Sequence, residues 1–593
     1  MSNNLKQIYE AISNSSNKIF CKLENSQITY AELRARIELF SGYFTNKRLS
    51  SGARIVVCSD DEEFTISIMA AALFNGIALT VLTTATPKTR LSAIIAVLQP
   101  AALFIDEAKQ AIAEIKVDFH LFSIAKLTKS SSGLLKKFRK STTKNWLETL
   151  KEFPVQQAAI PEDTRLPAFI NFTSGTTGNP KGVQITIHNL LAHLATLCKV
   201  FGYNTNSQIL NNMILAHADG SLQGPILALY AGCTLHRPCG MDVQHLEHFL
   251  NTVYRDRVTH LITVPTVLSF IDRLAENDDY FDGGDFSHLI SVAGMLDNNL
   301  WRRLEKRFRL RVNNIYGLTE TVAGGIFCGP LDENFKHGTV GKPIDMSIQL
   351  VEGELWLKGE NVFAGYYNNS EATDCAFSEG WFKTGDLAKI DNEGFVSITG
   401  RIKELIITGG FNVHSAEVNE ALLLDERIAE AATVGFPDPE WQEIVVSAIV
   451  TNNHKPIDEQ SIIENCRKYL EGQKLPRKIF FLENLPKGDA GKVNIPKLKS
   501  IIEAAMNEEK NVTSSKSNLS EDALLALAAR IFKVNIGSLS LSSSVGTTTG
   551  WDSLGHLNLI MEIEKITGSS FSPQQIISVK SLRQILDVLK KKE

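Results

Sequence analysis

Residues 173–182, TSGTTGNPKG, carry side chains suited to holding phosphate groups, and they follow an apolar run, AFINF, that predicts a strand at Ala168–Phe172. Small hydroxyl residues and glycines let backbone N–H groups crowd around phosphate oxygens, and a lysine adds a point charge. Pro180 stands where the Walker A pattern GxxxxGK[ST], counted from Gly175, needs its second glycine, which disfavours a P-loop NTPase. A flexible turn is the alternative interpretation. The candidate phosphate contacts are Thr173, Ser174, Gly175, Thr176, Thr177, Gly178 and Lys181.

This loop resembles the signature loop of the adenylate-forming superfamily. That family contains acyl- and aryl-CoA synthetases, adenylation domains of nonribosomal peptide synthetases, and luciferases. Further segments match motifs of the family, in the family's order, between residues 25 and 500. They are TYAEL at Thr29–Leu33, YGLTE at Tyr316–Glu320, TGD at Thr384–Asp386, GRIKE at Gly400–Glu404 and GDAGKV at Gly488–Val493.

The resemblance implies an ATP-dependent ligase. A carboxylate attacks the α-phosphorus of ATP, pyrophosphate leaves, and a thiol then displaces AMP, so catalysis depends on positioning and charge neutralisation. The resemblance also implies that Thr319 contacts the α-phosphate, that Glu320 binds Mg²⁺, and that Lys492 reaches both the carboxylate and the α-phosphate. The other nucleotide contacts it implies are Gly294, Asn314 at the adenine amino edge, Tyr316 stacked on adenine, Gly317, Asp386 on the ribose hydroxyls, and Arg401 supporting Asp386.

Each of these residues also has an ordinary structural explanation. Asp386 could close a turn, Glu320 could be an acid at a helix N-terminus, and Lys492 could be a surface lysine. By resemblance, Lys403 is the hinge about which a small domain rotates between adenylation and thiol transfer. In the second state the glycines at 409–410 would face the thiol tunnel, and Glu417 would stabilise that loop.

The C-terminal segment supplies a candidate thiol. WDSL at Trp551–Leu554 precedes a run with helical periodicity, and Ser553 would begin that helix. This resembles acyl and peptidyl carrier proteins, whose serine bears 4′-phosphopantetheine, although a plain N-cap serine would give the same pattern. Helices are expected at Ser520–Phe532 and Val579–Lys592. From Ser515 to Glu593 there are nine Lys/Arg and seven Asp/Glu, a charge of +2, whereas many carriers are acidic.

The carboxylic acid is the least defined part. Anchored on His217 and Gly220, the run Asn212–Cys233 resembles the HxxG of acyl-CoA and fatty acyl-AMP ligases, in which the histidine gates the carboxylate site. Anchored on Gly232, it places Asp219-Gly220-Ser221 on the DxS of amino-acid-activating domains, where the aspartate pairs with an ammonium. We favour a non-amino acid, in which case a partly buried Asp219 needs another hydrogen-bond source. Small residues at Ala323, Gly324 and Gly325 suggest room in the pocket wall.

The elements that must position these residues follow an α/β pattern. β-Branched runs at Arg54–Cys58, Ala101–Ile105, His260–Val264 and Leu289–Ala293 alternate with longer helical segments. The apolar stretch Phe64–Ala85 is interpreted as a helix, an Asn75-Gly76 turn and a strand rather than a membrane span. The basic run Ser130–Lys144 is expected to be a solvated insertion. We predict a large α/β domain at 1–400, a small α+β lid at 401–506, a linker at 507–518 and a helical-bundle carrier at 519–593.

Composition and charge narrow the class of protein. The 593 residues include 61 Lys/Arg and 66 Asp/Glu, a net charge of −5, which gives no support for nucleic-acid binding. Eight cysteines form no CxxC pair and the N-terminus lacks a signal peptide, so we expect a cytoplasmic protein with reduced thiols.

The expected function is adenylation of an acyl or aryl acid and its transfer to the pantetheine thiol of the chain's own or a partner carrier domain. That function implies ATP, Mg²⁺ and 4′-phosphopantetheine as cofactors, and a phosphopantetheinyl transferase and a downstream acyl acceptor as partners. The alternatives are an amino-acid-activating module of nonribosomal peptide synthetase type, an acyl-CoA ligase, a monooxygenase acting on its adenylate, and a non-catalytic scaffold.

Overall fold

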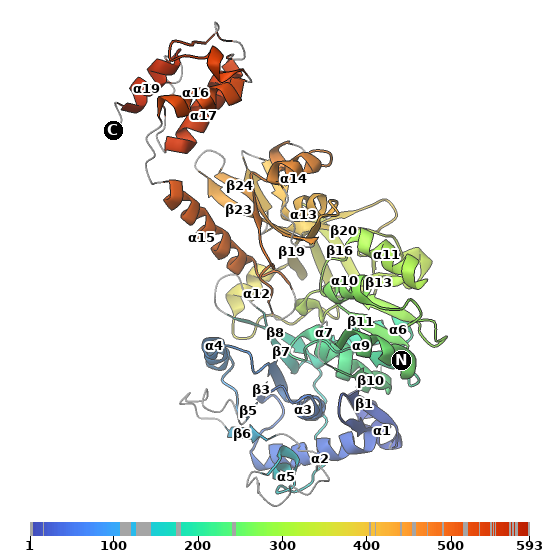
Figure 1. Ribbon diagram of the computed structural model, residues 1–593. Helices are drawn as coiled ribbons and strands as arrows, with labels where there is room; N and C mark the ends of the chain where they lie inside the picture. Colours follow the sequence, from blue (N-terminus) through green and yellow to red (C-terminus); the bar gives the residue numbers. More distant parts are fainter. Residues whose placement is uncertain are drawn as a thin grey trace, which may run out of the picture. The chain divides into compact units, whose positions relative to one another are not determined.

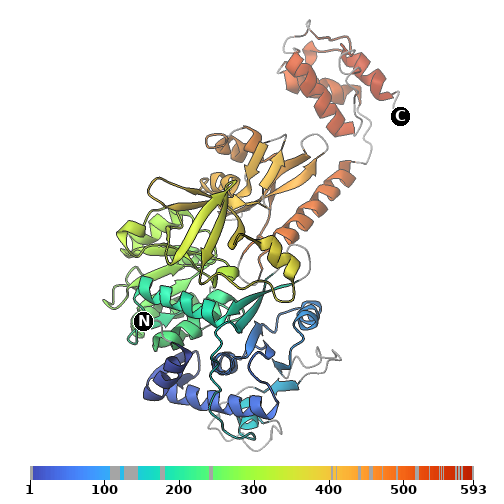
Figure 2. The ribbon, with the colours of Figure 1, turned by 180° about the vertical axis from the view of Figure 1, so that it is seen from behind.

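The computed structural model describes residues 4–15, 17–106, 120–125, 144–173, 180–239, 245–402, 405–408, 411–438, 442–452, 458–470, 472–488, 492–513, 520–532, 534–545, 548, 551, 553–567, 571, 575 and 579–590. Two compact units divide the chain, Met1–Val493 and Asn494–Glu593. The first contains four sheets with helices packed against them (Figures 1 and 2). Within the described residues, no helix is both long and apolar enough to span a bilayer.

Two largely parallel sheets form the base of the first unit. The nine-stranded sheet runs in the order β15 (Lys342–Pro343), β14 (Ile326–Cys328), β13 (Val312–Tyr316), β12 (His288–Ser291), β11 (His260–Thr263), β9 (Gln208–Leu210), β10 (Thr234–Arg237), β1 (Ile19–Leu23) and β2 (Gln27–Thr29). The six-stranded sheet runs β6 (His120–Ile124), β5 (Ala102–Asp106), β3 (Arg54–Cys58), β4 (Ala78–Leu82), β7 (Pro167–Thr173) and β8 (Lys181–Thr186). Parallel strands joined by helices are the expected outcome of the alternating β-branched and helical segments.

Helices pack around these two sheets. They are α1 (Leu5–Asn14), α2 (Tyr30–Asn46), α3 (Glu62–Phe74), α4 (Lys88–Leu98), α5 (Trp146–Leu150), α6 (Ile187–Phe201), α7 (Ala218–Ser221), the π-helix η2 (Leu222–Ile226), α8 (Leu227–Ala231), α9 (Leu246–Arg255), α10 (Pro265–Leu274) and α11 (Asn298–Phe308). Thr29 begins α2 with a capping box: its Oγ1 accepts from the backbone N–H of Glu32, whose carboxylate accepts from the backbone N–H of Thr29. The apolar stretch at 64–85 is confirmed as helix α3, a turn at Asn75–Gly76 and strand β4.

An antiparallel sheet links this base to the lid. It contains β16 (Met346–Val351), β17 (Glu354–Gly359), β18 (Phe377–Ser378), β19 (Trp381–Ile390) and β20 (Val396–Arg401), with helix α12 (Ser370–Ala376) beside β18. The lid sheet orders β22 (Phe411–His414), β21 (Leu405–Thr408), β24 (Gln442–Thr451) and β23 (Ile428–Asp438), with β25 (Lys478–Phe481) on β24. Helices α13 (Ser415–Leu423) and α14 (Glu459–Cys466) contribute to the lid's own apolar core.

The second unit is helical. It comprises α15 (Ile495–Thr513), α16 (Glu521–Phe532), α17 (Ser553–Thr567) and α19 (Leu582–Lys590), and the last three share a core of their own. Phe532 stacks on Trp551 within that core, their ring centroids 4.8 Å apart. Residues 507–513 of the predicted linker form the end of α15. The two glutamates and the lysine at 508–510 are good helix formers, so the lack of an apolar face did not mean the lack of a helix.

Candidate active site

The base of the predicted phosphate loop is a β-hairpin. Strands β7 and β8 pair antiparallel, with Thr173 directly opposite Lys181. Ser174, Gly175, Thr176, Thr177, Gly178 and Asn179 lie outside the described residues. The hairpin therefore fixes Lys181 at one root of the loop and Thr173 at the other.

Glu320 lies next to this hairpin through a residue that the sequence analysis did not single out. Tyr366 donates its phenol O–H to Glu320 Oε1 at 2.9 Å. The centroid of the Tyr366 ring lies 5.1 Å from Lys181 Nζ. Glu320 itself follows β13 in a short 3₁₀ turn, η4 (Thr319–Thr321), and its carbonyl accepts from the Phe363 N–H at 2.8 Å. Three chain segments thus bring the predicted Mg²⁺ ligand and the predicted phosphate-binding lysine to one tyrosine.

The geometry of Glu320 fits a magnesium ligand. One carboxylate oxygen accepts from Tyr366, while Oε2 has no hydrogen bond to any other residue that the structure describes. Mg²⁺ is commonly held by one or two carboxylates together with substrate phosphates and water. Glu320 could hold the metal in that manner, with the phosphates near Lys181. The metal would neutralise charge that develops on those phosphates.

A second polar cluster surrounds Asp386, which is buried with only 2% of its surface exposed. Tyr316 donates its phenol O–H to Asp386 Oδ2 at 2.6 Å, and Arg401 Nε approaches Oδ1 at 2.7 Å from the paired strand β20. Burial and the neighbouring Asp386 hold the pKa of Tyr316 well above its usual value, so Tyr316 remains a donor. Each carboxylate oxygen keeps a second lone pair, so Asp386 can still accept from two ribose hydroxyls. The contact between Tyr316 and Asp386 is additional to the stacking predicted for the tyrosine.

Asn314, on β13, is buried, and its Oδ1 has no partner among the described residues. A buried acceptor without a partner carries a cost that a bound amino group would remove. This observation fits the predicted contact with adenine.

The two predicted nucleotide-contact glycines differ in how strictly their backbone requires glycine. At Gly294 a Cβ would meet only Pro265, at 3.4 Å, so a side chain could be accommodated there. At Gly317, by contrast, a Cβ would lie 2.2 Å from the Gly324 nitrogen, so the turn after β13 requires a glycine.

The residues predicted to contact the acid lie around α7 and its continuation. His217 caps α7, and its carbonyl accepts from Ser221 Oγ at 2.8 Å. A Cβ at Gly220 would lie 2.2 Å from the Ile214 carbonyl oxygen, so this glycine serves backbone packing. Asp219 Oδ1 accepts from Gln223 Nε2 at 3.1 Å, and the same amide nitrogen donates to the Ala323 carbonyl at 3.2 Å. Gln223, which the sequence analysis missed, therefore joins Asp219 to the other predicted wall.

The sequence suggested open space beside residues 323–325, but other side chains pack closely against Gly324 and Gly325. A Cβ on Gly324 would lie 2.3 Å from Cε1 of His193, on α6, and a Cβ on Gly325 would lie 2.6 Å from Cε of Met346. His193 is buried, its ring nitrogens have no partner among the described residues, and burial lowers its pKa to about 3. The small residues at Gly324 and Gly325 thus permit close packing against a neutral imidazole and a methionine, and the assignment of Gly324 to the pocket wall stays a prediction.

Lys492 lies at the end of the lid, where its carbonyl accepts from the Gly488 N–H at 2.8 Å. Burial raises the pKa of Asp219 to about 6, and the positive charge of Lys492 partly opposes that rise. The sign of this effect is the one expected if Lys492 serves the acid side of the site.

The raised pKa of Asp219 gives a testable stability profile. Its folded pKa lies above its unfolded value, so the ionised carboxylate destabilises the fold at neutral pH, and stability rises as pH falls through 6 toward 4. Asp219→Asn should therefore raise the free energy of unfolding at pH 7 by about 1–3 kcal/mol, at 1.36 kcal/mol per pKa unit. The gain should vanish below pH 4. Urea unfolding at several pH values measures it, with the exposed Asp374→Asn as control; an equal gain at every pH would contradict the assignment.

The predicted hinge and thiol-side residues are only partly described. Lys403, Gly409 and Gly410 lie outside the described residues. Glu417 caps α13 by accepting from the His414 N–H at 3.0 Å and pairs with Lys474 at 3.0 Å. In the second unit Ser553 is the first residue of α17, as predicted, while Asp552 and the Ser553 side chain lie outside what is described.

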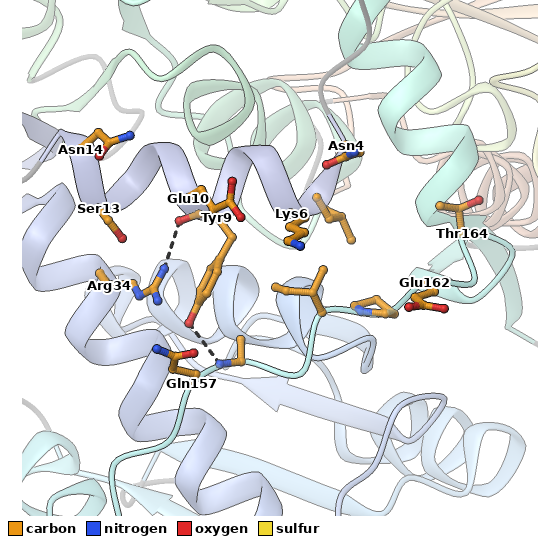
Figure 3. Close-up of a pocket in the computed structure, with 14 residues that line it drawn as sticks. Asn4, Lys6, Tyr9, Glu10, Ser13, Asn14, Arg34, Gln157, Glu162 and Thr164 are labelled. Carbon is orange, nitrogen blue, oxygen red and sulfur yellow. Dashed lines mark hydrogen bonds between the residues drawn. The ribbon is translucent and has the colours of Figure 1, made fainter.

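A separate hollow of about 880 Å³ lies beneath α1, away from every predicted site residue (Figure 3). The Arg34 guanidinium lies 3.5 Å from the centroid of the Tyr9 ring and donates to the Tyr9 carbonyl at 3.0 Å. The Tyr9 hydroxyl in turn accepts from the Ala158 N–H at 3.0 Å. These polar groups satisfy one another, so we attribute the cluster to the docking of α1.

The fold and the clusters around Glu320 and Asp386 define an adenylate-forming enzyme. The chain belongs to the family of AMP-binding enzymes: the family model matches residues 8–367, and the model of the AMP-binding enzyme C-terminal domain matches residues 417–492.

Known proteins similar to this chain are CoA ligases. A sulfoacetate–CoA ligase of Cupriavidus necator is 33% identical over 354 residues, 57% of this chain and 68% of that protein. A 2-succinylbenzoate–CoA ligase of Bacillus licheniformis is 32% identical over 362 residues, 58% of this chain and 73% of that protein. The matches thus span about two thirds of these relatives. At this level the predicted class, acid–thiol ligase, is confirmed.

Solved structures support the fold. ATP-bound MatB from Rhodopseudomonas palustris has a TM-score of 0.74 at 24% identity, covering 83% of this chain and 98% of that one. The o-succinylbenzoate CoA synthetase of Bacillus subtilis, solved with its acyl-adenylate, has a TM-score of 0.70 at 23% identity, covering 83% and 97%. The large domain and the small lid are confirmed by this likeness, which does not extend to the predicted carrier.

Proposed function

We propose that this protein joins a non-amino carboxylic acid to a thiol through an acyl-adenylate, using Mg²⁺ and ATP. The observation that carries the proposal is the convergence of three independent groups in one unit. Glu320 and Lys181 meet at Tyr366, Asp386 is held by Tyr316 and Arg401, and Lys492 acts on Asp219. These three groups are the ones expected to bind phosphate, ribose and carboxylate, respectively.

In the first step a carboxylate oxygen forms a bond to the α-phosphorus and the bond to pyrophosphate breaks. Two anions must approach, so the cations Lys181 and Lys492 would supply the necessary positive charge, and Mg²⁺ on Glu320 would add to it. Asp386 would orient the ribose, which fixes the α-phosphate relative to the acid. In the second step a thiol sulfur attacks the acyl carbon and AMP leaves.

A non-amino acid is favoured by the surroundings of Asp219. Its carboxylate accepts from Gln223, so the protein supplies one of the hydrogen bonds that this carboxylate needs when no substrate ammonium is present. The names of the relatives point in the same direction, since they describe ligases of sulfoacetate and 2-succinylbenzoate. Amino-acid activation would be the conclusion if pyrophosphate exchange in an acid panel occurred only with amino acids.

For the thiol we propose CoA, in line with the CoA ligases among the relatives. This departs from the carrier-bound thiol preferred from sequence. A pantetheine at Ser553 is the second candidate, because the C-terminal unit has its own helical core and α17 begins at that serine.

Protein coexpressed with a phosphopantetheinyl transferase, and given ATP and an acid active in pyrophosphate exchange, is assayed with and without added CoA to distinguish the two thiols. If CoA is the acceptor, Ser553→Ala should form free acyl-CoA at the wild-type rate, measured by chromatography. If the carrier is the acceptor, intact-mass spectrometry should show pantetheine and acyl additions that Ser553→Ala lacks and the exposed-serine control Ser542→Ala retains. Acylation of the protein in the absence of CoA would overturn the proposal that CoA is the acceptor.

A further inference from the structure

Tyr366 stands where three separate parts of the first unit meet. Its hydroxyl contacts Glu320, which follows β13, and its ring lies beside Lys181, the first residue of β8. Its own segment precedes α12. No motif in the sequence analysis includes this tyrosine.

The backbone around Tyr366 holds its side chain in one place. The Tyr366 N–H donates to Thr373 Oγ1 at 2.9 Å, and Tyr366 forms an isolated antiparallel bridge with Val183 of β8. The ring packs edge-on against Phe363 at a centroid distance of 4.9 Å. A phenol fixed from both its backbone and its ring can orient a neighbouring carboxylate.

The chemistry of the contact runs in one direction. The phenol O–H of Tyr366 donates and the Glu320 carboxylate accepts, because an ionised carboxylate has no proton to donate. Glu320 Oε1 is thereby engaged, while Oε2 has no other partner in the part of the chain that the structure describes. The Lys181 ammonium lies near the electron-rich Tyr366 ring, which attracts a cation. The tyrosine therefore contacts both the proposed metal ligand, Glu320, and the proposed phosphate-binding residue, Lys181.

We propose that Tyr366 is a positioning residue for the metal: its hydroxyl holds the Glu320 carboxylate in the orientation that binds the Mg²⁺ of Mg·ATP. This inference rests on the proposed function. Hydrogen-bond partners of metal-ligating carboxylates have a large effect on metal affinity, commonly 10- to 100-fold.

The test separates metal binding from nucleotide binding. Calorimetric titration with ATP is carried out on the whole protein with saturating Mg²⁺ and, separately, with EDTA. The Kd in EDTA divided by the Kd with Mg²⁺ gives the factor by which the metal tightens ATP binding. Tyr366→Phe keeps the ring beside Lys181 and removes only the hydroxyl, so we expect that ratio to fall roughly 10-fold while the Kd in EDTA stays unchanged. Tyr367→Phe removes a hydroxyl at the next position, whose ring lies 5.8 Å from Arg54, and should leave both values unchanged.

The double variant Glu320→Gln/Tyr366→Phe tests whether Tyr366 acts through Glu320. It should show no loss beyond Glu320→Gln alone. An unchanged ratio in Tyr366→Phe, or an additional loss in the double variant, would overturn the inference. A fall in ATP affinity that is equal with Mg²⁺ and EDTA would also overturn it, because it would reveal a purely structural role. If the wild type itself bound ATP without benefit from Mg²⁺, the proposed function would fail instead.

Discussion

Replacing Lys492 with alanine is expected to slow formation of the acyl-adenylate by about 10²–10³-fold, the usual effect of removing one group that stabilises charge in a transition state. The carboxylate and the α-phosphate are both negative, and in the proposed mechanism Lys492 is the cation that lies between them. The positive charge of Lys492 opposes the rise in the pKa of Asp219, as expected for a lysine that serves the acid side of the site. Carboxylate-dependent exchange of labelled pyrophosphate into ATP measures this step.

The second half-reaction provides the critical comparison. In the proposed cycle the lid carries Lys492 away before the thiol attacks, so Lys492→Ala should still convert supplied acyl-adenylate to thioester within a few-fold of the wild-type rate. Lys497→Ala, an exposed lysine on α15, is the matched control and should retain both activities. Equal loss of the two half-reactions in Lys492→Ala would contradict the assigned role.

Local sequence patterns predicted the framework of the site well. The run AFINF became β7, and Lys181 begins the strand that pairs with it. TYAEL, matched only as a family motif, forms the capping box of α2. These features succeed because strand periodicity and helix caps depend on residues a few positions apart.

Contacts between distant segments were not predictable in the same way. Tyr366 and Glu320 are 46 residues apart, and Tyr316 and Asp386 are 70 apart, yet each pair shares a hydrogen bond. The family motifs named three of these four residues but not their pairing. Nothing local to a tyrosine after a glycine indicates a carboxylate 46 residues away, because only the tertiary fold brings the two together.

Volume was the other quantity that sequence could not supply. Small residues at Gly324 and Gly325 suggested space, but whether a missing side chain leaves a cavity depends on what packs against it. Here His193 and Met346 occupy those positions. The glycines therefore serve close packing, and Gln223, which contacts both Asp219 and the Ala323 carbonyl, is the polar link between the two predicted walls.

Asp386→Asn should weaken ATP binding by about 10- to 100-fold, since each hydrogen bond to a charged group contributes about 1.5–3 kcal/mol and 1.4 kcal/mol corresponds to tenfold. The carboxylate accepts from Tyr316 and Arg401 at once, and an asparagine offers only one acceptor oxygen, so a donor would face a donor inside the protein. Direct titration with ATP measures the loss. Asp374→Asn, exposed on α12, controls for the change of charge.

A deoxynucleotide makes this prediction specific to the ribose. If Asp386 accepts from both ribose hydroxyls, wild-type protein should bind 2′-deoxy-ATP about tenfold more weakly than ATP, because one charge-assisted hydrogen bond is lost. Asp386→Asn should largely lose this discrimination, since the bond in question is already impaired. Discrimination that persists unchanged in the variant would show that Asp386 serves only to hold Tyr316 and Arg401. The Tyr316→Phe variant, which removes one donor but leaves the carboxylate, should keep the preference for ATP and thereby separate the ribose contact from the protein contact.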